Sequence, residues 1–225
     1  MQREKSKKVL VVGTFRSGTN LLKFMLEENF YAEVVFSEWF WKHSVPPTSV
    51  LCPIPDSVPI VVVTKAPIPL NASLYNFWKI RRPELDCGSS ISDFIRKRFL
   101  VYDNTGGLIK PKYAFPSPTD YWNQYHFSWL NWAEVNDRLF FLQLEKLRLD
   151  TSLELEAIAK KLKLRRRTDR QIVLPNTPAI PSRDGERSHL GQLDQAFREH
   201  LTDDDVTFIT NRVYQDVAHK LGYNI

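Results

Sequence analysis

Residues 8–20 read Lys8-Val-Leu-Val-Val-Gly13-Thr-Phe-Arg-Ser-Gly18-Thr-Asn20, and this stretch decides the fold. The run from Lys8 to Gly13 is apolar and β-branched, which is typical of a parallel strand buried on both faces. Residues 21–26, Leu-Leu-Lys-Phe-Met-Leu, follow with helical spacing. A strand, a glycine-bounded turn and a helix in this order open an α/β domain. We therefore expect three layers, α/β/α, around a central and mostly parallel sheet.

The rest of the chain continues this pattern within what we expect to be a single domain, residues 1–225. Hydrophobic periodicity and turn residues predict further strands at 33–36, 60–64 and 139–142. Helices are expected at 69–82, 90–102, 119–135, 151–164 and 201–221, the last opened by Thr202 as its cap. The segments 44–59, 104–118 and 165–187 are rich in proline, glycine or charge and are expected to be loops.

Composition argues against a disulfide-stabilised secreted protein and against a membrane-spanning protein. With 225 residues and 43% hydrophobic residues, the chain can bury a core without disulfides. Cys52 and Cys87 form no CxxC pattern, which favours a reducing compartment, and we expect a cytoplasmic protein. Residues 1–8 are polar and no run is long enough to span a membrane, so neither a signal peptide nor a transmembrane segment is expected. The net charge of +5 favours anionic ligands.

The loop after the first strand has the features of an anion site. A glycine-bounded loop between a buried strand and a helix presents backbone N–H groups, and the helix N-terminus adds partial positive charge. Gly13 and Gly18 have the spacing of a kinase P-loop, but Thr19 stands where the kinase lysine belongs. The cation of this loop is instead Arg16, two residues before Gly18.

The segment Arg16-Ser-Gly-Thr-Asn-Leu-Leu22 resembles the 5′-phosphosulfate-binding loop of the sulfotransferases, [KR]-[ST]-G-T-[TSN]-x-[LF]. The resemblance implies a P-loop-like nucleotide-binding fold and 3′-phosphoadenosine 5′-phosphosulfate (PAPS) as co-substrate, with no metal ion. Arg16 would then be both a PAPS ligand and the catalytic cation that stabilises the leaving phosphate oxygen. The residues that would hold the 5′-phosphate are Ser17, Gly18, Thr19, Asn20 and Leu21.

A second phosphate site lies further along the chain. Sulfotransferases carry an arginine at the end of their next long strand and a serine eight positions later, and both contact the 3′-phosphate of PAPS. Here Lys65 directly follows the strand at 60–64 and Ser73 comes eight positions after it, with lysine in place of arginine. The late segment from Arg187 to Leu193 resembles the family's R-K-G-x-x-G-x-W, so Arg187 is the candidate to close over the same phosphate, with Arg183 as a substitute.

A hydroxyl acceptor must lose its proton as it attacks sulfur, so a positioned base is expected. Lys42-His-Ser-Val-Pro46 is similar to the K-T-H-L-P segment that supplies a histidine base in one sulfotransferase branch. Glu38, ahead of Trp39-Phe-Trp41, resembles the glutamate base of carbohydrate-modifying branches. We prefer His43 to Glu38 as the base, and Lys42 could assist in stabilising the sulfuryl charge.

The stretch 138–150 also resembles the family, and there Glu145 is expected to order a turn rather than to act in catalysis. The expected reaction is sulfuryl transfer from PAPS to a hydroxyl or amine of a carbohydrate or small molecule. Because the chain is short for the family, the acceptor cleft is expected to be open or completed by another subunit.

Two other functions compete with this interpretation. A P-loop kinase or ATPase would need a lysine after Gly18 and an aspartate at a strand end. A non-enzymatic nucleic-acid module would use the basic residues 160–170, but no aromatic side chains alternate with them. We expect no nucleic-acid partner.

Overall fold

The structure is a computed structural model. It describes residues 6–39, 41–46, 54–81, 87–103, 110–167, 172–173, 179–181, 187–189 and 201–225. Residues 81, 102–103, 110–112, 179–181 and 187–189 among these are described by their backbone alone. Within these ranges no helix is long and apolar enough to cross a membrane.

The central sheet confirms the expected α/β fold. Its four strands are all parallel, in the order β2-β1-β3-β6. They are β1 (Lys7–Gly13), β2 (Ala32–Val35), β3 (Ile60–Thr64) and β6 (Leu139–Gln143). Gly13 pairs with Val63, so β1 and β3 end together and the segments that follow them leave from the same edge of the sheet.

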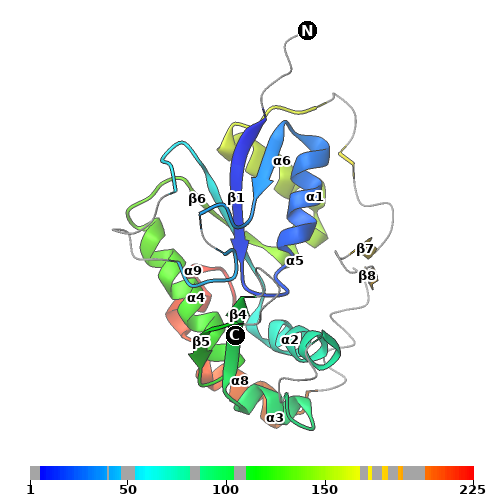
Figure 1. Ribbon diagram of the computed structural model, residues 1–225, viewed down its shortest axis with the longest axis vertical. Coiled ribbons are helices and arrows are strands. Elements are labelled where there is room, and N and C mark those ends of the chain that lie inside the picture. The colour runs from blue at the N-terminus through cyan, green and yellow to red at the C-terminus, as the bar shows by residue number, and fades with distance from the viewer. Residues whose placement is uncertain are drawn as a thin grey trace.

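Helices cover both faces of the sheet and give the expected three layers (Figure 1). The alternation along β1 produces them, because Val9 and Val11 face one core while Leu10 and Val12 face the other. The first core is shared with α1 (Thr19–Asn29), α5 (Leu144–Leu149) and α6 (Thr151–Leu162). The second is shared with α2 (Pro67–Arg81), α3 (Ile91–Arg96), α4 (Pro118–Ala133), α8 (Asp203–Arg212) and α9 (Gln215–Lys220).

The segment 90–118 differs from the prediction. The expected helix at 90–102 ends at Arg96, and β4 (Phe99–Asp103) begins three residues later. The expected loop at 104–118 contains β5 (Lys110–Phe115), which pairs antiparallel with β4. Phe99 and Val101 are buried against α4, and burying alternate residues of a strand outweighs the local helical pattern here.

Three smaller predictions also change. The helix expected at 201–221 is two helices, α8 and α9, although Thr202 caps the first as predicted. Asp150, rather than Thr151 or Ser152, caps α6 by accepting the N–H of Leu153 at 3.0 Å. The expected loop at 165–187 contains the short strand β7 (Ala179–Pro181), which pairs antiparallel with β8 (Arg187–His189).

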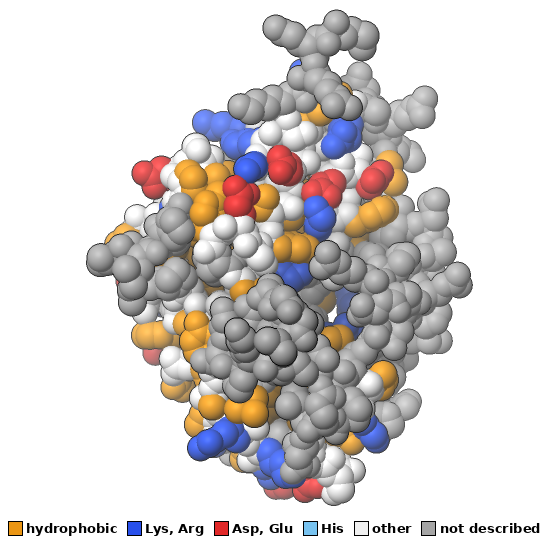
Figure 2. Space-filling model, in the orientation of Figure 1, with side chains coloured by type: hydrophobic (Ala, Val, Ile, Leu, Met, Phe, Trp, Pro, Cys, Tyr) orange, Lys and Arg blue, Asp and Glu red, His pale blue; other side chains and the backbone are white. Residues whose placement is uncertain are grey.

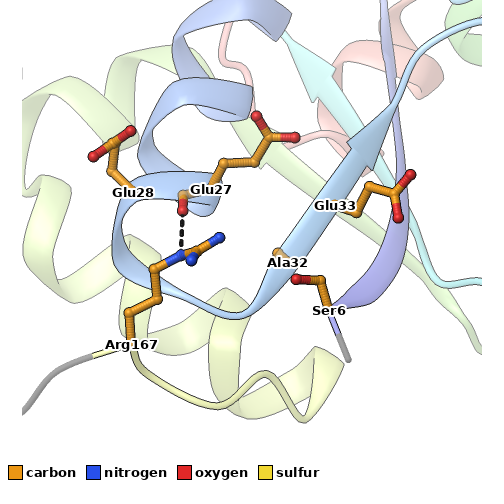
Figure 3. Close-up of a pocket in the computed structure, with 6 residues that line it drawn as sticks. All are labelled: Ser6, Glu27, Glu28, Ala32, Glu33 and Arg167. Carbon is orange, nitrogen blue, oxygen red and sulfur yellow. Dashed lines mark hydrogen bonds between the residues drawn. The ribbon is translucent and has the colours of Figure 1, made fainter. Parts of the chain in front are cut away.

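The amino ends of the strands lie on a surface of mixed charge. Figure 2 shows acidic and basic side chains interspersed over the upper part of the molecule, which Figure 1 identifies as this end of the sheet. A cavity of about 460 Å³ opens here (Figure 3), and it is lined by Ser6, Glu27, Glu28, Ala32, Glu33 and Arg167. Its lining is acidic, so it does not suit the anion that the loop after β1 is expected to bind.

The basic run at residues 165–167 has a structural role at this same end. The backbone of Arg166 forms an antiparallel bridge with Phe30, just after α1. Arg167 donates from Nε to the carbonyls of Glu27 and Phe30, at 2.6 and 2.9 Å. The guanidinium groups of Arg165 and Arg167 both lie over the ring of Tyr31. These contacts hold the chain after α6 against the end of α1.

Candidate functional site

The loop between β1 and α1 is tightly folded at the carboxyl edge of the sheet. Arg16 and Gly18 both have positive φ angles, 64° and 91°. A Cβ on Gly18 would lie 2.6 Å from Cδ1 of Leu144, and one on Gly13 would lie 2.7 Å from the carbonyl oxygen of Val63. Glycine is therefore required at both positions, and the alternating backbone conformations form the kind of nest that suits an anion.

The N-terminus of α1 faces this loop without a protein cap. Gly18 is the N-cap residue and has no side chain to bond the first N–H groups, and the first turn contains no acidic residue. The first N–H groups of a helix have no partner within the helix, so they are available to an anionic ligand. Ser17 turns inward instead, since its hydroxyl donates to the carbonyl of Thr14 at 2.8 Å.

Arg16 reaches from the loop to the neighbouring helix. Its Nε donates to the Ser73 hydroxyl at 3.4 Å, and its guanidinium lies 5.1 Å from the centre of the Phe77 ring. Ser73 and Phe77 are one turn apart on α2, 57 or more residues later in the chain. Arg16 is predicted to bind the 5′-phosphosulfate and Ser73 the 3′-phosphate. The structure brings these two residues into contact.

Lys65 lies at the end of β3, on the same edge. Its side chain is buried, with 2% of the residue exposed. Its carbonyl accepts the indole N–H of Trp122 at 2.8 Å, which fixes the backbone where the strand ends. Ser73 is also buried, on the second turn of α2. Ser73 thus contacts Arg16 of the loop, and the backbone of Lys65 leaves β3 at the same edge of the sheet.

His43 contacts the loop directly. Its Nδ1 lies 2.7 Å from the carbonyl oxygen of Gly13, and its ring stacks on Phe15 with 4.3 Å between centroids. A carbonyl only accepts hydrogen bonds, so Nδ1 carries the proton and Nε2 keeps a free lone pair. Burial, assisted by the charge of Lys42, lowers the pKa of His43 to about 3, against the opposing effect of the bond to Gly13. The imidazole is therefore neutral near pH 7.

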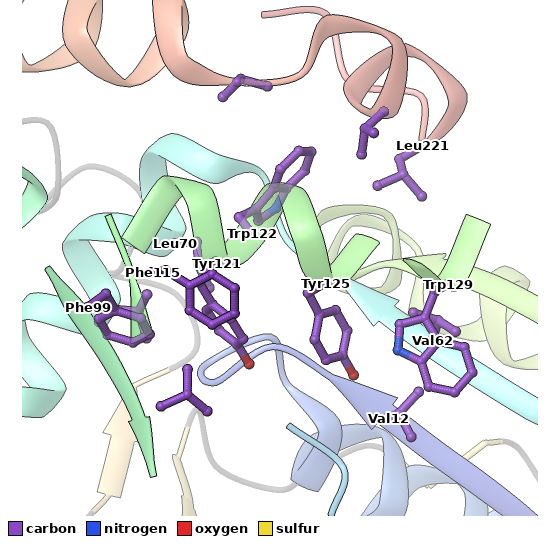
Figure 4. Close-up of a cluster of buried hydrophobic side chains, with 14 of the residues drawn as sticks. Val12, Val62, Leu70, Phe99, Phe115, Tyr121, Trp122, Tyr125, Trp129 and Leu221 are labelled. Atoms are coloured by element: carbon purple, nitrogen blue, oxygen red, sulfur yellow. The ribbon is translucent and has the colours of Figure 1, made fainter. Parts of the chain in front are cut away.

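Two buried tyrosines of α4 hold the segment that carries His43. Tyr121 donates from its hydroxyl to the carbonyl of His43, and Tyr125 to that of Lys42, both at 2.8 Å. Figure 4 shows both hydroxyls directed toward β1 and the loop that follows it. The carbonyl of Lys42 also accepts the N–H of Gly13 at 3.2 Å. Residues 42–43 are therefore anchored to the loop and to the helix behind it.

Lys42 places a second cation beside the loop. Its Nζ donates to Oδ1 of Asn20, in the first turn of α1, at 2.8 Å and lies 3.5 Å from the centre of the Phe36 ring. With Arg16 it gives the loop two cationic side chains. This arrangement suits a ligand that carries more than one negative charge.

Glu38, the alternative base, forms an ion pair with a lysine of β1. Both of its carboxylate oxygens accept from Nζ of Lys8, at 2.8 and 3.0 Å. Lys8 lies five residues before Gly13 on β1. The structure therefore pairs Glu38 with Lys8, whereas His43 contacts the loop directly.

The side chains of the remaining predicted residues are either buried in the core or outside the described residues. Leu21 is buried under the loop, so its side chain packs in the core and only its backbone lies in the first turn of α1. The backbone of Arg187 begins β8, but its side chain lies outside the described residues, as does the whole of Arg183. Among the residues described, no group of three or more histidine, cysteine or acidic side chains could hold a metal ion.

Three tyrosines that the sequence does not mark as functional hold the site together. Tyr121 and Tyr125 lie on an apolar stripe of α4, where an aromatic residue is most simply interpreted as core. Tyr223 lies near the end of the chain and contacts Thr64 and Glu145 at the carboxyl edge. The spacing of two tyrosines on one face of α4 was the only local signal, and it does not say what their hydroxyls bind.

These observations define an α/β domain with an anion-suited loop at the carboxyl edge of a parallel sheet, the edge at which such sheets bind ligands. No protein-family model matches the chain, and no curated protein matches its sequence. Among solved structures, the fold is similar to that of mouse sulfotransferase SULT7A1 complexed with PAP, with a TM-score of 0.59. The match has 12% sequence identity and covers 97% of this chain and 89% of the other. It shows that the two proteins share a fold.

Proposed function

We propose that this protein is a sulfotransferase that moves a sulfuryl group from PAPS to a hydroxyl or amine of a carbohydrate or small-molecule acceptor. The observation that carries the proposal is the 3.4 Å contact between Arg16 of the loop and Ser73 of α2. It puts the two predicted phosphate sites side by side, as one nucleotide phosphorylated at both its 3′ and 5′ positions requires. The PAP complex of the structural neighbour is consistent with such a ligand.

The residues present suit the 5′-phosphosulfate end of PAPS. The uncapped N-terminus of α1 and the glycines of the loop offer backbone N–H groups, and Arg16 and Lys42 supply positive charge. In sulfuryl transfer the acceptor oxygen or nitrogen forms a bond to sulfur, while the bond from sulfur to the bridging phosphate oxygen breaks. Negative charge then grows on that phosphate oxygen, and Arg16 is the cation placed to stabilise it.

The residues that would hold the 3′-phosphate are Lys65 and Ser73, with Arg187 as a further candidate from the sequence. Lysine keeps the charge of the family's arginine but presents a single ammonium group instead of a planar fork. Because Arg16 already bonds Ser73, the serine hydroxyl lies between the two ends of the proposed nucleotide site.

His43 is the base that this geometry favours. Its Nδ1–H is held by the Gly13 carbonyl, so Nε2 is the atom that would take the acceptor proton. Burial keeps the pKa of His43 near 3 in the free protein, so the ring is unprotonated when the substrates arrive. The negative charge of a bound nucleotide would raise that pKa and make the nitrogen a stronger base.

Two arrangements disfavour the competing functions. A kinase lysine is missing at Thr19, and the segments after β3 and β6 present Lys65 and Glu145 rather than the aspartate of a magnesium site. The basic run 165–167 is used to close the end of α1, on the opposite edge of the sheet, so it supports a structural role more than a nucleic-acid surface.

Calorimetry with PAP (adenosine 3′,5′-bisphosphate) against ATP–Mg²⁺ tests the proposal. We expect the protein to bind PAP, and to bind ATP–Mg²⁺ weakly or not at all. A screen of phenols, amines and sugars with sulfur-labelled PAPS would then identify the acceptor. Binding of ATP–Mg²⁺ in preference to PAP would reject the sulfotransferase assignment.

A further inference from the structure

The turn after β3 is held by a chain of hydrogen bonds that starts near the end of the sequence. The Tyr223 hydroxyl lies 3.1 Å from Oε2 of Glu145 and 2.9 Å from Oγ1 of Thr64. The other carboxylate oxygen of Glu145 accepts the backbone N–H of Ala66 at 2.9 Å. Residues 64 and 66 are therefore linked through Tyr223 and Glu145, and Lys65 lies between them.

The chemistry of the groups sets the direction of these bonds. A carboxylate only accepts, so Tyr223 donates to Glu145 and can accept from the Thr64 hydroxyl. Burial, together with the charge of Glu145, raises the pKa of Tyr223 above its ordinary value. The phenol therefore keeps its proton and can donate it to Glu145.

A glycine turn brings Tyr223 to this position. Gly222 has a φ of 78°, and the N–H groups of Gly222 and Tyr223 both donate to carbonyls in the last turn of α9 at 2.9 Å. This is the Schellman pattern, in which a left-handed residue reverses the chain at the end of a helix. Gln143, the last residue of β6, donates to the carbonyl of Leu221 at 2.5 Å and fixes the turn against the sheet.

The backbone of Lys65 is thus fixed on both sides as well as at its own carbonyl, which Trp122 holds. We propose that Glu145 and Tyr223 are positioning residues for the 3′-phosphate of the nucleotide, acting through the backbone that aims Lys65. The inference rests on the proposed function, which assigns Lys65 and Ser73 to that phosphate. On this inference, the turn at Gly222 and Tyr223 contributes to the selectivity for nucleotides that carry a 3′-phosphate.

Tyr223→Phe tests this by removing one hydroxyl. Thr64 then still has the carbonyl of Leu142, 3.4 Å away, as an acceptor, so we expect the variant to fold. Calorimetry would compare PAP with adenosine 5′-monophosphate, which lacks the 3′-phosphate. We expect the preference for PAP to fall about fivefold, the equivalent of one neutral hydrogen bond, while the affinity for the monophosphate stays unchanged.

Tyr214→Phe is the matched control. Its hydroxyl accepts from Nε2 of Gln124 at 3.1 Å on the surface, and the residue is 43% exposed, so its loss should leave the preference for PAP unchanged. Glu145→Gln tests the same link from the other end, because Ala66 and Tyr223 donate to different carboxylate oxygens and glutamine keeps only one of them. We expect a fall in the PAP preference of the same order as for Tyr223→Phe.

The outcomes separate this inference from the proposed function. If the wild-type protein does not bind PAP, the proposed function fails and the inference fails with it. If the wild type prefers PAP and Tyr223→Phe keeps that preference, or loses affinity for both nucleotides equally, then Tyr223 is structural and only the positioning role is rejected.

Discussion

The backbone groups at the two ends of α1 have different partners. At its C-terminus, Arg167 bonds the carbonyls of Glu27 and Phe30 through its side chain and that of Asn29 through its backbone N–H. The side chain of Asn29 adds hydrogen bonds to Met25 and to the backbone of residue 173. At its N-terminus, Gly18 provides no side-chain cap and the first turn holds no acid. One end is closed by protein, and the other has no side-chain cap.

The difference shows how the two ends of one helix can serve different purposes. Both ends of the helix carry backbone groups that need partners. The chain after α6 supplies donors to the C-terminal carbonyls, but the described residues supply only nearby cations, Arg16 and Lys42, to the N-terminal N–H groups. Positive charge beside N–H groups that have no side-chain cap favours an anion, whereas donors matched to acceptors favour stability.

Removing the arginine from each end gives the largest expected contrast. Arg16→Ala should lower sulfuryl transfer roughly 10²- to 10³-fold, because it removes the cation that meets the leaving oxygen, with little change in melting temperature. Arg167→Ala should instead lower the free energy of unfolding by about 1–2 kcal/mol, through its lost hydrogen bonds, and leave turnover unchanged. Labelled-sulfate transfer and thermal unfolding measure the two effects. Full activity in Arg16→Ala would contradict the assignment of this end.

Two glycines with similar backbone angles provide the next comparison. Gly18 and Gly88 have φ of 91° and 80°, and an added Cβ would lie 2.6 and 2.5 Å from Leu144 and Asp93. Alanine at either position should lower the free energy of unfolding by about 1–2 kcal/mol or more, because a left-handed conformation and a close contact both oppose it.

Only Gly18→Ala should also weaken PAP binding, by about tenfold, because a displaced loop loses several N–H contacts to the phosphate. Denaturant unfolding and calorimetry on both variants check this. Equal PAP affinities in the two variants would mean that the loop after β1 does not bind the nucleotide.

A partly buried histidine at the loop, His43, and a fully buried one on α4, His126, give the smallest expected contrast. Burial lowers the pKa of His43 to about 3 and that of His126 to about 4. An unfolded histidine has a pKa of about 6.5, so their contribution to stability is complete above that pH. This contribution to the free energy of unfolding declines as the pH falls toward the pKa values of the folded protein, by about 1.4 kcal/mol per pH unit for each histidine. Unfolding measured between pH 7 and pH 5 should show this loss.

Bound PAP should distinguish the two rings. Its negative charges should raise the pKa of His43, which lies at the loop, and leave that of His126, which is enclosed in the core. Titration of the imidazole resonances by NMR, with and without PAP, measures both shifts. A pKa of His43 that does not respond to PAP would count against its role as the base.

Much of the fold could be predicted from the sequence because its signals are local. The strands at 7–13, 60–64 and 139–143 are short apolar runs, and each is visible without knowing its partner. The hairpin of β4 and β5 was missed because its strands are stabilised mainly by pairing with each other and packing on α4. Local propensity does not record such contacts.

The sequence by itself determined the strand, the glycine-bounded loop and the helix, since each depends on residue types within a few positions of one another. Only the tertiary structure decided that Arg16 meets Ser73, that His43 contacts Gly13 while Glu38 pairs with Lys8, and that Tyr223 reaches Glu145. Parallel strands are joined by long crossovers, so residues that meet at one sheet edge come from distant parts of the chain. The hydrogen-bond partner of each hydroxyl at that edge depends on how the helices pack against the sheet.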